Sequence, residues 1–331
     1  MAIQWIKIQN LLAFQNDAFS LPFCDGVNVL IGENGTGKTT LLKLLYAAME
    51  CASMEVGSGI NVKFYSFFSD HLKGTGFLKH PAHRDRPCNY QISDGKETIR
   101  FDFLEALKRH QSFRPDRRFN SVLIPATEML SHSKGFLAFS RKFRMPFDAT
   151  QVDIIMNASL PETWEVSPPM QSILDKISQV IDGTVIQEDD IFYILKNDGR
   201  KLDFSLEAEG LRKLGLLWKL IRNGLLEKDS ILLWDEPEAN LNPELFPLVA
   251  EIMLELSRNG VQIFVATHSY NFAKYLEIRR KAKEEVQFHT LYRESSGGIG
   301  SASGYEMEDS SRNPLIDADS KLLDEVYDLM E

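Results

Sequence analysis

Three segments of the chain are apolar at almost every position, which is the pattern of strands buried on both faces of a sheet. They cover residues 26–31, 231–234 and 261–265. Segments rich in helix formers, or with apolar residues at helical spacing, predict helices over 40–49, 170–181 and 210–226. Buried strands and helices in this arrangement predict an α/β fold.

β-Branched and alternating segments predict further strands. They cover residues 3–9, 18–23, 61–68, 184–187, 191–195 and 201–204. Asp94-Gly95 predicts a hairpin that joins strands at 90–93 and 97–103. Residues 69–87 predict a mobile basic loop, and residues 131–178 are mostly helical with breaks at prolines.

The 331 residues are 44% hydrophobic and 25% charged, which fits one large folded domain, or one domain with an inserted lobe. The amino-terminal residues do not have the pattern of a signal peptide, and no apolar run approaches membrane-spanning length. We therefore expect a cytoplasmic protein without membrane contact. Cys24, Cys51 and Cys88 lack the spacing of a disulfide framework or of a cysteine zinc site.

Charge is unevenly distributed along the chain, whose formal net charge is −10. Residues 71–144 contain 15 Lys and Arg against 7 Asp and Glu, a charge of +8, whereas residues 303–331 carry −7. The basic region predicts contact with nucleic acid or with an acidic partner. An ordinary solvated surface is the alternative, because charge clusters alone specify little.

Residues 32–39, Gly-Glu-Asn-Gly-Thr-Gly-Lys-Thr, match the phosphate-loop pattern G-x-x-x-x-G-K-[ST] at every required position. A predicted strand precedes the loop and a predicted helix follows it, as the motif requires. The glycines let backbone N–H groups point at a phosphate, and the helix adds the positive end of its dipole. Lys38 is expected to reach the β- and γ-phosphates, and the Thr39 hydroxyl to coordinate Mg²⁺.

Polar residues also follow the other two buried strands. Asp235 and Glu236 come directly after residues 231–234, so the strand delivers two carboxylates to the ligand-binding edge of the sheet. Asp235 is expected to hold Mg²⁺ and Glu236 to polarise an attacking water; helix capping by both acids is the alternative. His268 follows the strand at 261–265 and is expected to sense the γ-phosphate.

With these three motifs the sequence resembles the soluble, non-transporter ABC-type ATPases that include the SMC, RecF and OLD proteins. The phosphate loop resembles their Walker A motif, residues 231–243 resemble their Walker B motif and D-loop, and Ala-Thr-His-Ser at 266–269 resembles their switch histidine. The resemblance implies a P-loop NTPase head with a mixed sheet and an inserted, mainly helical lobe. We expect the core at residues 1–60 and 184–300, a β-hairpin and helical lobe at 61–183, and an acidic tail with a short helix at 301–331.

The resemblance also implies ATP and Mg²⁺ as cofactors and assigns roles to individual positions. Nucleotide contacts are expected at Glu33, Asn34, Gly35, Thr36, Gly37, Lys38, Thr39, Thr40, Ala208, Glu209 and Gly210, metal contacts at Thr39, Asp235 and Glu128, and catalysis at Glu236 and His268.

Two positions depart from the family pattern. In the signature loop, Ala208 stands where the family has a serine, and Ser205 is the alternative hydroxyl. Glu128 is the nearest equivalent of the Q-loop glutamine, with a solvated loop acid as the alternative. Phe14 is interpreted as a core residue, with stacking on adenine as the alternative.

Such ATPases hold two nucleotides between head-to-tail subunits, so one phosphate loop and one signature imply a homodimer. We predict an ATPase that dimerises on ATP, hydrolyses it and controls a nuclease or toxin effector encoded nearby, in anti-phage defence. One alternative is an ATPase that acts in DNA repair or binds DNA through residues 71–144. The other is a scaffold that binds ATP without hydrolysing it, and the Asp235-Glu236 pair argues against that scaffold.

Overall fold

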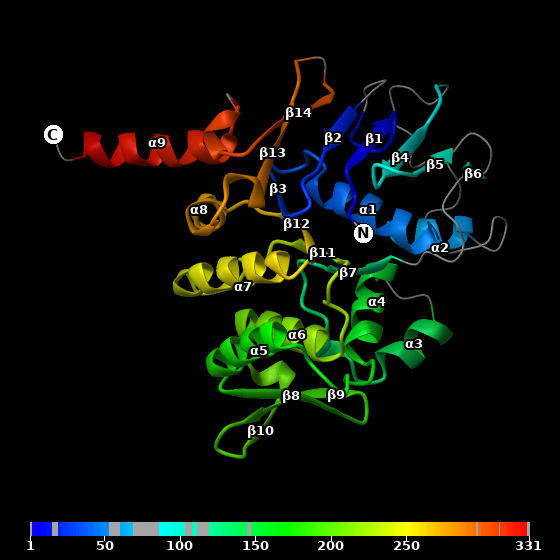
Figure 1. Cartoon of the computed structure of the whole chain (residues 1–331), viewed down its shortest axis with the longest axis vertical. Coiled ribbons are helices and arrows are strands. Elements are labelled where there is room, and N and C mark those ends of the chain that lie inside the picture. Colours follow the sequence, from blue (N-terminus) through cyan, green and yellow to red (C-terminus); the bar gives the residue numbers. More distant parts are fainter. Residues whose placement is uncertain are drawn as a thin grey trace.

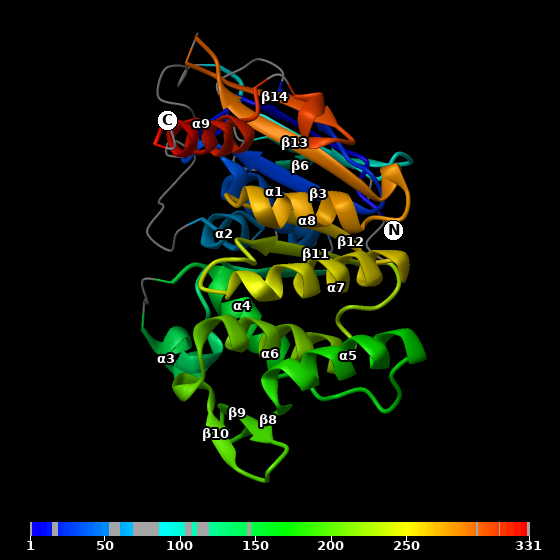
Figure 2. The ribbon, with the colours of Figure 1, turned by 90° about the vertical axis from the view of Figure 1, so that its left-hand side faces the viewer.

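The computed structural model describes residues 2–14, 19–52, 60–68, 86–102, 108–110, 119–143, 147–295, 297–310 and 312–329. A six-stranded sheet runs through the middle of the molecule in the order β14-β13-β3-β12-β11-β7 (Figures 1 and 2). Its strands are β3 (Val27–Gly32), β7 (Asn120–Ile124), β11 (Ser230–Asp235), β12 (Gln262–Ala266), β13 (Val286–Arg293) and β14 (Ile299–Gly304). Neighbouring strands are parallel except β14, which pairs antiparallel with β13. The three predicted buried strands are confirmed.

This central sheet is buried on both faces, which explains its continuous apolar runs. Successive residues of β11 point to opposite sides, so Leu232 and Trp234 lie in one core and Ile231 and Leu233 in the other. All four side chains are at most 1% exposed. The sheet therefore separates two hydrophobic cores and holds the ends of its strands in fixed register.

One core lies between the central sheet and a five-stranded antiparallel sheet, with α1 (Lys38–Ala52) packed in it. The order of this second sheet is β2-β1-β4-β5-β6. Its strands are β1 (Trp5–Gln9), β2 (Phe19–Pro22), β4 (Asn89–Ser93), β5 (Thr98–Asp102) and β6 (Lys108–His110). The predicted hairpin is confirmed, because β4 pairs with β5 across Asp94-Gly95 and Gly95 has a φ of 84°.

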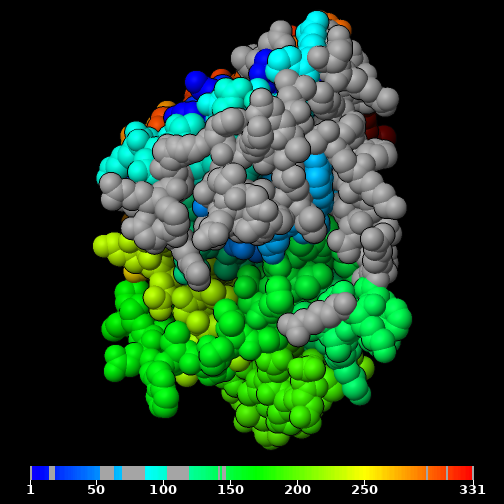
Figure 3. All heavy atoms as spheres, turned by 90° about the vertical axis from the view of Figure 1, so that its right-hand side faces the viewer, coloured from blue at the N-terminus to red at the C-terminus, as the bar shows by residue number. Residues whose placement is uncertain are grey.

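The other core lies under a layer of helices and a three-stranded meander. The helices are α3 (Phe136–Lys142), α4 (Ala149–Ala158), α5 (Pro168–Ile181), α6 (Glu209–Arg222), α7 (Phe246–Arg258) and α8 (Tyr270–Arg279), and the meander strands are β8 (Gly183–Glu188), β9 (Ile191–Lys196) and β10 (Lys201–Asp203). In Figure 3 the green part of this layer, from α3 to β10, lies in the lower half of the side shown. The predicted helix after Pro168 and the predicted meander are therefore confirmed.

The strand predicted at 61–68 is wrong, because residues 60–66 form the helix α2 (Ile60–Ser66). Phe64 and Phe67 are three positions apart and both fully buried, which is the spacing of a helical face. The ring of Phe67 packs edge-on against Tyr46 of α1 at a centroid distance of 5.3 Å. A short aromatic run fits the repeat of a strand and the repeat of a helix equally well. Packing against α1 favours the helix. The predicted loop at 69–87 lies outside the described residues up to position 85.

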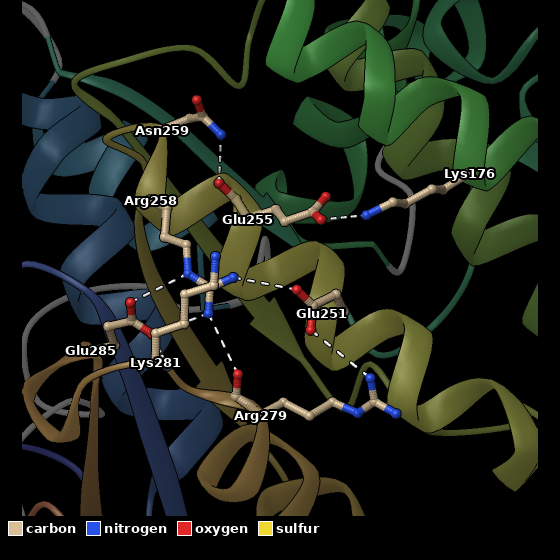
Figure 4. Close-up of polar contacts among 8 residues, drawn as sticks. All are labelled: Lys176, Glu251, Glu255, Arg258, Asn259, Arg279, Lys281 and Glu285. Atoms are coloured by element: carbon tan, nitrogen blue, oxygen red, sulfur yellow. Dashed lines mark hydrogen bonds and ion pairs between the residues drawn. The ribbon is translucent and has the colours of Figure 1, made fainter.

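An ion-pair network ties the outer helices to the sheet (Figure 4). Arg258, at the end of α7, donates to Glu285 at 3.1 Å and 3.3 Å and to Glu251 at 3.3 Å. Glu285 directly precedes β13. Burial by itself would raise the pKa of its carboxyl group, but its hydrogen bonds and the charge of Arg258 hold that pKa below the usual value. A separate ion pair joins Lys176 of α5 to Glu255 of α7. These contacts fix the position of α7, which follows the D-loop in the chain.

Segments of the predicted lobe are distributed over the molecule. Within 61–183, β4 pairs with β1, β7 pairs with β11, and α4 and α5 pack in the helical layer. Within 301–331 the structure shows the end of β14 and the helix α9 (Pro314–Asp328). The domain limits themselves stay a prediction. In the described part of the chain, no helix combines the length and the apolar character needed to cross a membrane.

Candidate functional site

A glycine-rich loop joins β3 to α1 and has the backbone that the phosphate-loop motif predicts. Gly35 and Gly37 have φ values of 76° and 93°, in the left-handed region that favours glycine. A Cβ on Gly37 would lie 2.9 Å from the ring of Phe14. Phe14 is fully buried and supports the loop, so its interpretation as a core residue is confirmed. Glu33 and Asn34 lie exposed on the loop, and Thr36 is buried within it.

Lys38 begins α1 and turns its side chain back to the loop. Its Nζ donates to the carbonyl oxygens of Gly32 at 2.8 Å and Glu33 at 2.9 Å, and the residue is 5% exposed. Burial lowers the pKa of Lys38 to about 8, although the charges of Asp235, Glu236 and Glu238 oppose the shift. The loop thus encloses an ammonium group whose charge is incompletely compensated in the protein alone.

The phosphate loop and the end of β11 meet through one hydrogen bond. Thr39 Oγ1 donates to Asp235 Oδ2 at 2.9 Å, although the two residues are 196 positions apart. Burial raises the pKa of Asp235, against the hydrogen bond from Thr39. A hydroxyl beside a carboxylate is a donor set that suits Mg²⁺ together with phosphate oxygens and water. Among the described residues no group of three His, Cys, Asp or Glu forms a metal cage, so an ion here would depend on such outside ligands.

Glu236 occupies a constrained backbone position at the end of β11. Its φ is 48°, unusual for a residue other than glycine. Its N–H donates to Ala266 of β12 at 2.9 Å, and its carbonyl accepts from Lys213 Nζ at 2.9 Å. The carboxylate lies 3.7 Å from His268 Nε2, and both side chains are more than one-third exposed. Burial and Lys38 lower the pKa of His268, so the neutral ring contacts Glu236 at pH 7.

Glu238 and Lys213, to which the sequence motifs gave no role, complete this site. Glu238 accepts from Thr267 Oγ1 at 2.5 Å and from the His268 N–H at 3.1 Å, and burial raises its pKa. It therefore fixes the backbone at Thr267 and His268, which we call the histidine loop. Lys213 lies on α6, is 2% exposed and has a pKa lowered by burial. A lysine on the buried face of an amphipathic helix was the sequence signal for it.

The segment Ala208-Glu209-Gly210 forms the start of α6. Ala208 is the N-cap residue and makes no side-chain capping hydrogen bond. A Cβ on Gly210 would lie 2.7 Å from the carbonyl oxygen of Asn240, so the start of α6 packs closely on the D-loop of the same chain. Ser205 Oγ donates to Asp203 at 2.6 Å and is engaged in the turn before α6.

Glu128 lies in the segment after β7 and is not the solvated loop acid of the alternative interpretation. Its side chain is 2% exposed, and its carboxylate accepts from Arg212 of α6 at 3.1 Å. It also accepts from the backbone N–H groups of Leu130 and Ser131. A metal contact would require this carboxylate to leave Arg212, and its role as a metal ligand stays a prediction.

Comparison with known proteins identifies the family. The model described as "AAA domain, putative AbiEii toxin, Type IV TA system" matches residues 27–273, more than half of the chain. The chain belongs to this family. The matched range includes the phosphate loop, the carboxylates after β11 and His268.

This AAA-domain protein is also similar to parts of curated ATP-binding proteins. The L-cystine import ATP-binding protein TcyN of Bacillus subtilis (strain 168) is 38% identical over 106 residues, which cover 27% of this chain and 39% of that protein. The glutamine transport ATP-binding protein GlnQ of the same organism is 39% identical over 54 residues, which cover 16% of this chain and 22% of GlnQ. The chain therefore spans about two-fifths or less of the length of these relatives.

Solved structures share the fold. An SMC head bound to the C-winged helix domain of ScpA aligns with a TM-score of 0.55 and 16% identity, over 92% of this chain and 98% of that chain. The SMC head domain from Thermotoga maritima aligns with a TM-score of 0.50 and 15% identity, over 92% of this chain and 99% of that chain. The chain thus has the P-loop NTPase fold of SMC heads and belongs to an AAA-domain family, so the predicted fold class and the predicted AAA family are confirmed.

The enclosed ammonium of Lys38 predicts a pH dependence of ATP binding. Because the pKa of Lys38 is about 8 in the protein alone, and a triphosphate favours the charged form, ATP binding above pH 8 requires proton uptake. Affinity should therefore fall about tenfold per pH unit above about 8, and stay level below it. Titration calorimetry between pH 8 and pH 9.5 measures this. The variant Lys38→Arg stays charged, so its ATP affinity should not change with pH in this range. Equal affinity of the wild-type chain at pH 8 and pH 9.5 would contradict the prediction.

Proposed function

We propose that this protein hydrolyses ATP with Mg²⁺, dimerises when ATP is bound, and controls a partner effector protein in the cytoplasm. The observation that carries the catalytic part is the hydrogen bond of 2.9 Å between Thr39 and Asp235. It brings the end of the phosphate loop and the first carboxylate of β11 to one point, where these two oxygens would hold Mg²⁺ and the ion would neutralise phosphate charge.

Each residue of the site has a distinct part in this proposal. The loop N–H groups and Lys38 bind the phosphates, while Thr39 and Asp235 hold Mg²⁺, which supplies charge neutralisation. Glu236 orients the attacking water and accepts its proton, and its constrained backbone fixes the direction of the carboxylate. His268 lies against Glu236, and Glu238 holds the histidine loop in place.

The start of α6 supports the dimer. A helix N-terminus binds anions through free N–H groups and its dipole, and Ala208 offers no side-chain cap that would occupy them. We infer that Ala208, Glu209 and Gly210 contact the γ-phosphate bound by a second copy of the chain. Since alanine replaces the hydroxyl that the related ATPases have, turnover should be slow.

Two findings support a partner effector. The family description includes a putative AbiEii toxin of a type IV toxin–antitoxin system, and we infer from it that the effector is a toxin that acts in anti-phage defence. An SMC head of the same fold is bound to a domain of ScpA, so a head of this shape can hold a partner protein. The competing function is DNA binding through the basic region at 71–144, much of which lies outside the described residues. A DNA-binding ATPase would lose affinity for DNA steeply with salt, whereas an effector switch would bind little DNA at any salt.

Mass measurement tests the proposal. The wild-type chain with ATP and Mg²⁺ should hydrolyse ATP slowly and shift from monomer to dimer, and return to monomer when the nucleotide is consumed. Lys38→Ala should do neither, because the charge that offsets the triphosphate is gone. A wild-type chain that binds ATP and stays monomeric would contradict the dimer, and one without turnover would contradict the enzyme.

A further inference from the structure

The helix α9 is attached at its first turn, and the rest of it extends away from the molecule. Asn313 caps it by accepting from the Leu315 N–H at 3.1 Å and donates to the Met307 carbonyl at 2.9 Å. Asn313 is 2% exposed, and Leu315 and Ile316 pack against the core below the central sheet. Figure 1 shows the rest of the helix extending away from the sheets and from α8. Its direction is therefore set by its capped, packed end.

The projecting part of α9 carries an apolar surface that the described chain leaves uncovered. No residue of α9 is buried. Beyond its first turn the large apolar side chains Leu322, Leu323, Val326 and Tyr327 are between 45% and 65% exposed, and Leu329, directly after the helix, is 87% exposed. At helical spacing, Leu322 and Val326 continue the line of Leu315 along one side. An exposed apolar stripe of this kind marks an interaction surface.

The negative charge of α9 indicates which kind of partner can bind its apolar stripe. Residues 313–329 contain five acids, Asp317, Asp319, Asp324, Glu325 and Asp328, and a single base, Lys321, a net charge of −4. A second copy of α9 would bring two such charges together, which is unfavourable. Nucleic acid and anionic membrane surfaces are repelled in the same way. An amphipathic helix with basic residues beside its apolar side would cover the apolar stripe of α9 and pair with its acidic residues.

We propose that the apolar side of α9, centred on Leu322 and Val326, binds a basic amphipathic helix of a partner protein. This inference rests on the proposed function, because it names the surface by which the controlled effector is held. The surface lies on a separate element from the nucleotide site, so it can be tested without ATP.

The probe is a fluorescent synthetic peptide of about 20 residues, with leucines in a helical stripe and lysines elsewhere. Its binding to the full chain is followed by anisotropy at physiological salt. Leu322→Asp removes an apolar contact yet adds a negative charge, so it should weaken binding roughly tenfold or more. The matched control Ser320→Asp adds the same charge on the exposed helix outside the Leu322–Val326 line, and should bind as tightly as wild type or more tightly. A peptide with glutamates in place of lysines should not bind.

Three outcomes overturn the proposal. If Leu322→Asp binds the lysine peptide as tightly as the wild-type chain does, the attraction is due to charge alone. If the glutamate peptide binds as tightly as the lysine peptide, the charge of α9 does not determine which helix it binds. A nucleotide-free dimer of the wild-type chain that Leu322→Asp dissociates would identify a second copy as the occupant. ATP turnover separates this test from the proposed function. Both variants should match wild type in turnover, and a wild-type chain that binds the peptide selectively but does not hydrolyse ATP would contradict the function and leave this surface standing.

Discussion

Glu236→Gln is expected to hydrolyse ATP about 10²- to 10⁴-fold more slowly than the wild-type chain, because glutamine keeps the shape of the side chain but cannot accept the proton of the attacking water. ATP binding should survive, since Lys38, Thr39 and Asp235 are unchanged. The variant should therefore accumulate as an ATP-bound dimer. Steady-state phosphate release measures the rate, and light scattering with ATP measures the mass.

Glu244→Gln is the matched control for this change. Glu244 lies exposed in the short 3-10 helix η5 (Pro243–Leu245) after the D-loop, and the same substitution there should leave turnover unchanged. Wild-type turnover in Glu236→Gln would show that another residue accepts the proton, and His268, 3.7 Å away, would be examined first. A monomeric Glu236→Gln chain with bound ATP would contradict a site shared between two copies.

Gly37→Ala is expected to weaken ATP binding about 100-fold or more, because two independent effects displace the loop. The φ of 93° strains any residue with a side chain, and the new Cβ would meet the ring of Phe14 at 2.9 Å. Since Phe14 is fully buried, the loop has to move. Loss of two charge-assisted N–H contacts to phosphate costs about 3–6 kcal/mol, which corresponds to a factor of about 10² to 10⁴ in affinity.

Gly199→Ala separates strain from the clash. Gly199 has a similar φ of 85° in the turn before β10, but nothing lies within 4 Å of a Cβ built there. This variant should lose about 1 kcal/mol of stability through backbone strain, with ATP affinity unchanged. Affinity is measured by calorimetry and stability by thermal unfolding. Wild-type ATP affinity in Gly37→Ala would contradict the assignment of residues 32–39 as the phosphate-binding loop.

The local pattern of the sequence predicted the buried strands β3, β11 and β12 of the central sheet, but it did not predict β13 and β14. Strands such as β11 and β12 are buried on both faces, so they appear as continuous apolar runs that need no knowledge of their neighbours. The hairpin at Asp94-Gly95 follows from turn chemistry in the same way. The failure at 61–68 has the opposite cause. A short aromatic run fits either a strand or a helix, and only contact with Tyr46 of α1 favours the helix α2.

The same division holds at the site. The spacing of residues 32–39 determined the phosphate loop, because the backbone bends and the lysine position lie within a few bonds of each other. The pairing of Thr39 with Asp235 and the contact of His268 with Glu236 join separate elements, and parallel strand order brings them to one edge of the sheet. No local sequence pattern indicated that Phe14 supports Gly37 or that Glu128 binds Arg212. Such contacts depend on how elements pack across a core, and the tertiary structure alone decided them.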